Sequence, residues 1–137
     1  TKEKIMGNRA VIAFERTINS KPLRSPNCMG IYLHWNGGRD SVEGFLQVAK
    51  DYGLRSCSYG VARLSQIISN YMGGTLSVGV DIVKHLDCDN FDNGTYWVDS
   101  GFNIVGRDFF EDGIEQSGYP LDEMVADIKL KNNEHFN

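Results

Sequence analysis

The chain of 137 residues has the length of one domain, with the 41% hydrophobic and 23% charged residues of an ordinary globular protein. Its formal net charge of −4 argues against a DNA- or RNA-binding protein, which usually carries a basic face. The three cysteines are widely spaced, which argues against a disulfide scaffold and a structural zinc site. The apolar runs are too short to cross a bilayer. We therefore expect one soluble, intracellular domain over 1–137, with no cofactor and no membrane, DNA or RNA partner.

The first part of the chain predicts two paired strands. Arg9–Glu15 and Met29–Trp35 are rich in β-branched and aromatic residues, and we expect them to lie in one sheet. A polar loop that contains Pro22 and Pro26 separates them.

Two consecutive helices are expected next. After Asp40 the apolar residues recur at helical spacing as far as Gly53, and Asp40 with Glu43 resembles a capping box. A second apolar face predicts a helix over Ser58–Met72, which Gly73-Gly74 ends.

The second half predicts short strands and a last helix. We expect a strand at Thr75–Val80, a type I′ hairpin at Asn93-Gly94 that leads into Thr95–Val98, and a strand at Asn103–Asp108. A C-terminal amphipathic helix follows Pro120. Antiparallel strands in two blocks, with two central helices between them, predict the α+β class.

The loop Trp35–Ser41 joins a strand to a helix N-terminus. Its glycines let the backbone approach a ligand, and the free amides of a first helical turn attract anions. The motif is neither a P-loop nor a Rossmann fingerprint, and a simple capped strand-to-helix turn is the favoured interpretation. Its candidate ligand-binding residues are Trp35, Asn36, Gly37, Gly38 and Arg39.

The acidic run Asp87–Gly94 fails the test for an EF-hand. Phe91 and Val98 stand where a calcium loop needs oxygen ligands, so turn-forming hydrogen bonds explain the Asp and Asn residues better. Hydrogen bonding to a ribose or an amino group stays open.

Two arginines are candidate phosphate ligands. Arg55 follows a helix end and Arg107 ends a strand, and a guanidinium binds phosphate through two parallel hydrogen bonds. Pairing with a nearby carboxylate is the alternative for each. The three histidines, His34, His85 and His135, show no metal spacing, and the chain carries no local signature of a nucleophilic enzyme.

Four blocks of the sequence together resemble the first described family of phage Thoeris anti-defence proteins. They are Gly7–Ile12, Gly30–Ser41, Tyr59–Leu64 and Ile104–Arg107, and the resemblance extends over most of the chain. Members of that family bind the cyclic ADP-ribose isomers made by TIR-domain enzymes, such as glycocyclic ADP-ribose, without degrading them. The resemblance therefore implies a phage protein of the host bacterial cytoplasm that blocks Thoeris immunity and is not an enzyme.

The resemblance also implies site residues and partners. Arg107 and Arg55 are expected at phosphate and Asn90 at ribose or base, with Phe91, Trp97 and Trp35 as candidate stacking aromatics. It implies a homo-oligomer, a dimer or hexamer, and cyclic oligonucleotides as a further ligand class. The alternative function is an enzyme that hydrolyses a cyclic nucleotide, with His34 or His85 as the base.

Overall fold

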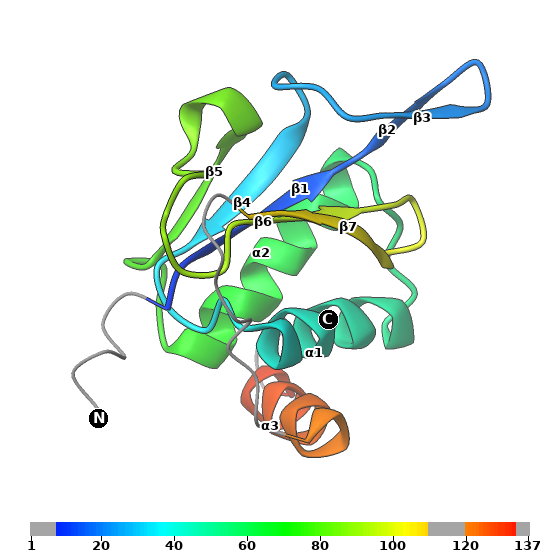
Figure 1. The fold of residues 1–137 in the computed structure, drawn as a ribbon. Helices are drawn as coiled ribbons and strands as arrows, with labels where there is room; N and C mark the ends of the chain where they lie inside the picture. The colour runs from blue at the N-terminus through cyan, green and yellow to red at the C-terminus, as the bar shows by residue number, and fades with distance from the viewer. Residues whose placement is uncertain (1–7, 110–119, 134–137) are drawn as a thin grey trace.

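The computed structural model describes residues 8–109 and 120–133 of the chain (Figure 1). Within these ranges the chain forms strands, three α-helices and one short 3-10 helix. In chain order they are β1 (Ala10–Phe14), β2 (Arg16–Ile18), β3 (Lys21–Leu23), β4 (Met29–Leu33), α1 (Arg39–Asp51), α2 (Ser58–Met72), β5 (Val78–Ile82), η2 (Val83–His85), β6 (Thr95–Val98), β7 (Ile104–Asp108) and α3 (Leu121–Asn132).

A five-stranded sheet with the order β5-β4-β1-β6-β7 forms the centre of the fold. The predicted pairing of the first two strong strands is confirmed, since β1 runs antiparallel to β4. The α+β class is confirmed too, but the β1–β6 pairing is parallel, with Ile12 opposite Tyr96. A parallel pair needs a long crossover, and the chain between β1 and β6 supplies one that includes α1 and α2.

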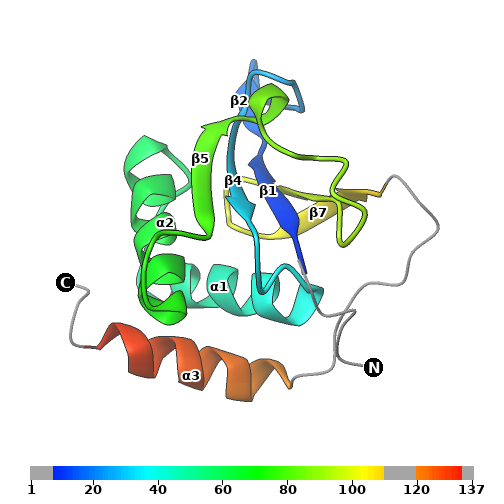
Figure 2. The ribbon, with the colours of Figure 1, turned by 90° about the vertical axis from the view of Figure 1, so that its left-hand side faces the viewer.

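One face of the sheet packs on the helices (Figure 2). Ile12 and Phe14 of β1 join the main core with Phe45 of α1 and Leu64 of α2, all of them at most 2% exposed. The helix α3 packs on both α1 and α2. At Gly44 an added Cβ would lie 2.7 Å from Met124, so glycine lets α3 approach α1 closely.

The opposite face of the sheet is covered by loop segments and by η2 rather than by α-helices. Ala13 of β1 and Trp97 of β6 form a second buried cluster with Cys28 and Val83, which come from the loop before β4 and from η2. The Arg24 guanidinium lies over the Trp97 ring, 5.8 Å from its centroid. This face holds Thr95 and Trp97 of the candidate site described below. Arg107 is opposite Tyr96 in the strand register, and its guanidinium lies 5.7 Å from the centre of the Tyr96 ring, which belongs to the main core on the other face.

The segment expected to be a polar loop contains the β-hairpin of β2 and β3, here called the hairpin arm (Arg16–Leu23). Asn19 and Ser20 at its tip have φ values of 52° and 64°, the left-handed pair that a type I′ turn requires. The arm extends from the end of β1, away from the helices α1 and α3 (Figure 1).

Two local predictions were wrong. The residue that caps α1 is Gly38, and Asp40 lies inside the first turn, where its Oδ1 accepts a hydrogen bond from the Ser41 amide at 2.7 Å. The expected hairpin at Asn93-Gly94 does not form either, because Asn93 has no positive φ and β6 pairs with β1 and β7. The strand expected at Thr75–Val80 is shifted and becomes β5.

None of the helices in the described part of the chain is long and apolar enough to span a membrane.

Candidate ligand-binding site

The loops at the start of β1 meet around Asn8 and Arg9. The Gly37 amide donates to the Asn8 carbonyl at 2.8 Å, and the Asn93 amide donates to the Arg9 carbonyl at 3.0 Å. The Arg9 Nε also donates to Asp92 Oδ2 at 2.8 Å, and this bond raises the pKa of Arg9. Two loops far apart in sequence are thus fixed to one end of the sheet.

The acidic loop (residues 87–94) folds around the buried side chain of Asn90. Its Nδ2 donates to the carbonyls of Asp87 at 2.9 Å and Gly94 at 3.2 Å. Its Oδ1 accepts from the amides of Asp92 at 3.1 Å and Gly94 at 3.0 Å. Asn90 therefore holds the loop that Arg107 touches, and its predicted contact with ribose or base stays a prediction.

Arg107 lies on β7 beside this loop. Its Nε donates to the Asn93 carbonyl at 2.9 Å, and its Cζ lies 4.3 Å from the centre of the Phe109 ring. Arg107 lines a cavity of about 490 Å³, here called the Arg107 cavity. The other residues that line it are Val83, Cys88, Asp89, Thr95, Trp97, Asp108 and Phe109.

The strand β6 contributes Thr95 and Trp97 to this cavity from the sheet face that the helices leave open. The Trp97 indole Nε1 donates to Asp108 Oδ2 at 2.9 Å, and the side chain is 6% exposed. Thr95 is 2% exposed, and its Oγ1 has no hydrogen-bond partner among the described residues. A buried hydroxyl without a partner carries a desolvation cost. Because the oxygen itself is buried, a ligand atom reaches it only if the neighbouring side chains move.

The predicted Trp35–Arg39 loop lies at the same end of the sheet but outside the Arg107 cavity. Trp35 and Asn36 line a separate cavity of about 340 Å³, together with residues of α2 and α3. At Gly37 an added Cβ would lie 2.7 Å from the Asn8 carbonyl oxygen, so chain packing explains this glycine. Gly38 caps α1, and Arg39 Nε donates to Glu43 Oε2 at 3.2 Å.

Arg55 lies apart from Arg107, in the exposed turn before α2. The next residue, Ser56, lines a cavity that also contains Phe14 and Glu15 from the far end of β1. Within one chain, Arg107 therefore lies next to the loop that Asn90 holds, and Arg55 lies apart from both.

Cys57 caps α2, and a hydrogen bond from the Gly60 amide lowers the pKa of the Cys57 thiol.

The histidines proposed for the hydrolase alternative do not line the Arg107 cavity. His34 Nδ1 is hydrogen-bonded to the Tyr32 hydroxyl at 2.9 Å, and His85 Nδ1 lies 3.2 Å from Asp81 Oδ1. His135 lies outside the described residues. Among residues 8–109 and 120–133, the His, Cys, Asp and Glu side chains form no cluster of three that suits a metal ion.

The chain matches no protein-family model, no curated protein and no solved structure.

Sequence reasoning named only Arg107 and Trp97 among the residues that line the Arg107 cavity as ligand contacts and missed the others, including Thr95 and Phe109. Thr95 was assigned only to a strand, and its missing hydrogen-bond partner depends on the packing around it. Arg107 and Phe109 are two residues apart at the end of a predicted strand, and this spacing was a signal that both side chains lie on one face of it.

Proposed function

We propose that this protein binds a cyclic ADP-ribose isomer, such as glycocyclic ADP-ribose, and sequesters it without degrading it. The observation that carries the proposal is the pairing of the Arg107 guanidinium with the Phe109 ring, 4.3 Å away, in one cavity. A guanidinium binds phosphate oxygens through two parallel hydrogen bonds, and an aromatic face accepts a purine. The sequence resemblance supplies the ligand class.

The other groups of the Arg107 cavity suit the sugars of such a ligand. Its volume of about 490 Å³ falls within the range of roughly 300–1,000 Å³ that small-molecule sites occupy. The Asp108 carboxylate accepts hydrogen bonds from ribose hydroxyls, and the Thr95 hydroxyl can donate or accept. These residues support the proposal of a site for phosphate and ribose at the Arg107 cavity.

Sequestration requires affinity rather than catalysis. A phage protein that removes a signal from the host cytoplasm must bind below the signal concentration, near nanomolar, which corresponds to about −12 kcal/mol. A binding site whose loops are already ordered reaches such affinity more readily, because less conformational entropy is lost when the ligand binds. The hydrogen bonds that the Asn90 side chain makes to the backbone provide that order in the acidic loop.

A homo-oligomer, dimer or hexamer, belongs to the same proposal. Because Arg55 and Arg107 lie at different ends of the sheet, a ligand that contacts both arginines takes Arg55 from a neighbouring copy. Cyclic oligonucleotides are the further ligand class to test.

The direct test replaces Arg107. We expect Arg107→Ala to weaken binding of the cyclic ADP-ribose isomer by about 1.5–3 kcal/mol, or roughly 10- to 150-fold, measured by isothermal titration calorimetry. Arg107→Lys should recover only part of the affinity, since lysine lacks the planar fork. The control is Arg63→Ala, at an exposed position on α2. Normal affinity in a folded Arg107→Ala variant would remove this cavity from the proposal.

A further inference from the structure

We propose that Arg24 is a positioning residue of the Arg107 cavity, which holds Trp97 and the part of β7 before Arg107 in place without lining the cavity itself. Arg24 lies in the loop between the hairpin arm and β4. The inference rests on the proposed function, because an effect of Arg24 on ligand affinity requires that this cavity binds ligand.

The Arg24 side chain connects three segments of the sheet. Its Nε donates to Glu15 Oε2, directly after β1, at 2.6 Å. Its guanidinium lies 5.8 Å from the centre of the Trp97 ring of β6, and its Nη2 donates to the Val105 carbonyl of β7 at 3.2 Å. The strands β1, β6 and β7 are neighbours in the sheet, so one guanidinium joins all three on the face that the α-helices leave open.

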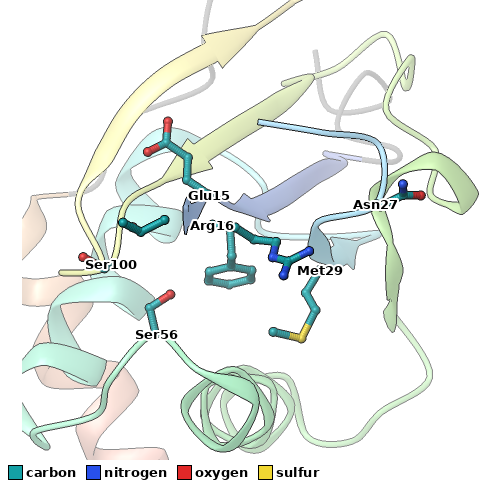
Figure 3. A pocket seen from close by; sticks show the side chains of 8 residues that line it. Glu15, Arg16, Asn27, Met29, Ser56 and Ser100 are labelled. Atoms are coloured by element: carbon teal, nitrogen blue, oxygen red, sulfur yellow. The ribbon is translucent and has the colours of Figure 1, made fainter. Parts of the chain in front are cut away.

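The carboxylate of Glu15 orients this guanidinium. Glu15 also lines a cavity of about 520 Å³, but its carboxylate points away from Met29 and Ser56 on the other walls (Figure 3). The Glu15 side chain is 9% exposed, so its bond with Arg24 is partly shielded from water. Shielding strengthens a charge-assisted hydrogen bond, and this bond therefore fixes one side of the guanidinium.

The carbonyl that Arg24 contacts on β7 belongs to a β-bulge. The register between β6 and β7 shifts by one residue next to Trp97, and Val105 is the residue left without a partner on β6. A bulge bends its strand and changes the direction of the side chains that follow. Because Arg107 comes two residues after Val105, the hydrogen bond from Arg24 to the bulge helps to set the direction of Arg107.

Gly106 gives the guanidinium room to lie against β7. An added Cβ at Gly106 would lie 2.7 Å from both terminal nitrogens of Arg24. The φ of Gly106 is not positive, so the backbone conformation does not require glycine here, whereas the packing of Arg24 does. A methyl group at this position would displace the guanidinium, which is the far end of a flexible side chain, and would leave the backbone in place.

Loss of the guanidinium would loosen one wall of the Arg107 cavity. The Trp97 ring would lose the cation that covers it, and the Val105 carbonyl would lose its donor. Trp97 also donates to Asp108, a further residue of the cavity, so a shift of the indole reaches both side chains. We expect Arg24→Ala to weaken binding of the cyclic ADP-ribose isomer by about 2- to 30-fold, although Arg24 does not line the cavity.

A double-mutant cycle over Arg24→Ala and Gly106→Ala tests the proposal by titration calorimetry with the cyclic ADP-ribose isomer. Each single variant should lose affinity, and the double variant should bind like Arg24→Ala, because no guanidinium is left for the methyl group to displace. Arg24→Lys keeps the charge but lacks the planar fork, so it should bind more like Arg24→Ala than like wild type. The control Arg16→Ala removes the same charge from an exposed position of the hairpin arm and should keep wild-type affinity.

The fluorescence of Trp97 in ligand-free protein gives a second readout that does not depend on the ligand class. In a Trp35→Phe background Trp97 is the only tryptophan, and it is 6% exposed in the wild-type chain. Arg24→Ala and Gly106→Ala should both increase the quenching of Trp97 by acrylamide, because each removes the guanidinium from its ring. Arg16→Ala should leave the quenching unchanged.

Three results in folded variants would overturn the positioning role. They are additive losses of affinity in the cycle, wild-type affinity in Arg24→Lys, and unchanged quenching of Trp97 in Arg24→Ala. A wild-type chain that binds no cyclic ADP-ribose isomer would instead refute the proposed function, and the quenching would then decide whether Arg24 holds Trp97.

Discussion

Replacing Thr95 with valine is expected to change the stability of the protein and its affinity for ligand in opposite directions. Valine has nearly the shape of threonine but lacks the hydroxyl, which is buried without a hydrogen-bond partner among the described residues. An unpartnered buried polar group costs about 1–3 kcal/mol. Thr95→Val should therefore stabilise the ligand-free protein by about 1 kcal/mol, which raises Tm by about 3–5 °C for a domain of this length.

The same substitution should weaken ligand binding. If the ligand forms a hydrogen bond with the Thr95 hydroxyl, its loss costs about 0.5–1.5 kcal/mol, or roughly 2- to 13-fold in Kd. Differential scanning calorimetry measures the first effect and titration calorimetry with the cyclic ADP-ribose isomer measures the second. The matched control is Thr75→Val, since Thr75 is exposed in the turn before β5.

Two outcomes would refute this reasoning about Thr95. A Tm that falls by several degrees would mean that the hydroxyl has a partner in the folded chain. An unchanged Kd in a stabilised variant would mean that the hydroxyl does not meet the ligand.

Three further predictions concern the acidic loop, the α1–α3 contact and the histidines. Asn90→Ala should destabilise the protein by about 2–4 kcal/mol in urea unfolding, because backbone groups of the acidic loop lose the hydrogen bonds that this side chain makes; a loss below about 1 kcal/mol would contradict this. The hydrogen bond from Lys129 lowers the pKa of Asp51 below its ordinary value of 3.8, so the stability that this carboxylate contributes is present at neutral pH and is lost as the pH falls below about 4. Asp51→Asn should therefore reduce stability by less than about 1 kcal/mol at pH 7 and flatten its acid dependence, and an equal loss at pH 7 and pH 2 would argue against the ion pair. The double variant His34→Ala, His85→Ala should keep ligand capture intact, and loss of capture in a folded variant would favour the hydrolase.

Sequence patterns correctly predicted those helices and strands whose ends are set by residues close by in the sequence. The helix α2 begins at Ser58 and ends at Met72 as its apolar spacing predicts, and Gly73 takes the left-handed conformation, φ 82°, that ends it. The strand β1 was predicted as well, and in the structure Ile12 faces the helices whereas Ala13 belongs to the cluster on the opposite face.

Contacts distant in sequence account for the errors. Asn93-Gly94 has the composition of a hairpin turn, but the Asn93 side chain donates to Asn8 Oδ1 at 2.7 Å, which ties the segment to the start of β1. The hairpin arm has exposed strands and a proline, so no alternation of apolar residues marks it. The candidate site also combines local and distant effects. The resemblance and the chemistry of the arginine side chain made Arg107 a candidate ligand residue. Tertiary packing, which the sequence did not reveal, places the Trp35 loop at another cavity.

The most direct test of the central claim follows the fate of the ligand. The protein is incubated with a TIR-produced cyclic ADP-ribose isomer, freed of unbound ligand and heat-denatured, and the released molecule is identified by mass spectrometry. The account predicts intact ligand, in one equivalent per Arg107 cavity. Cleaved product would identify an enzyme, and the absence of captured ligand would contradict the proposed ligand class.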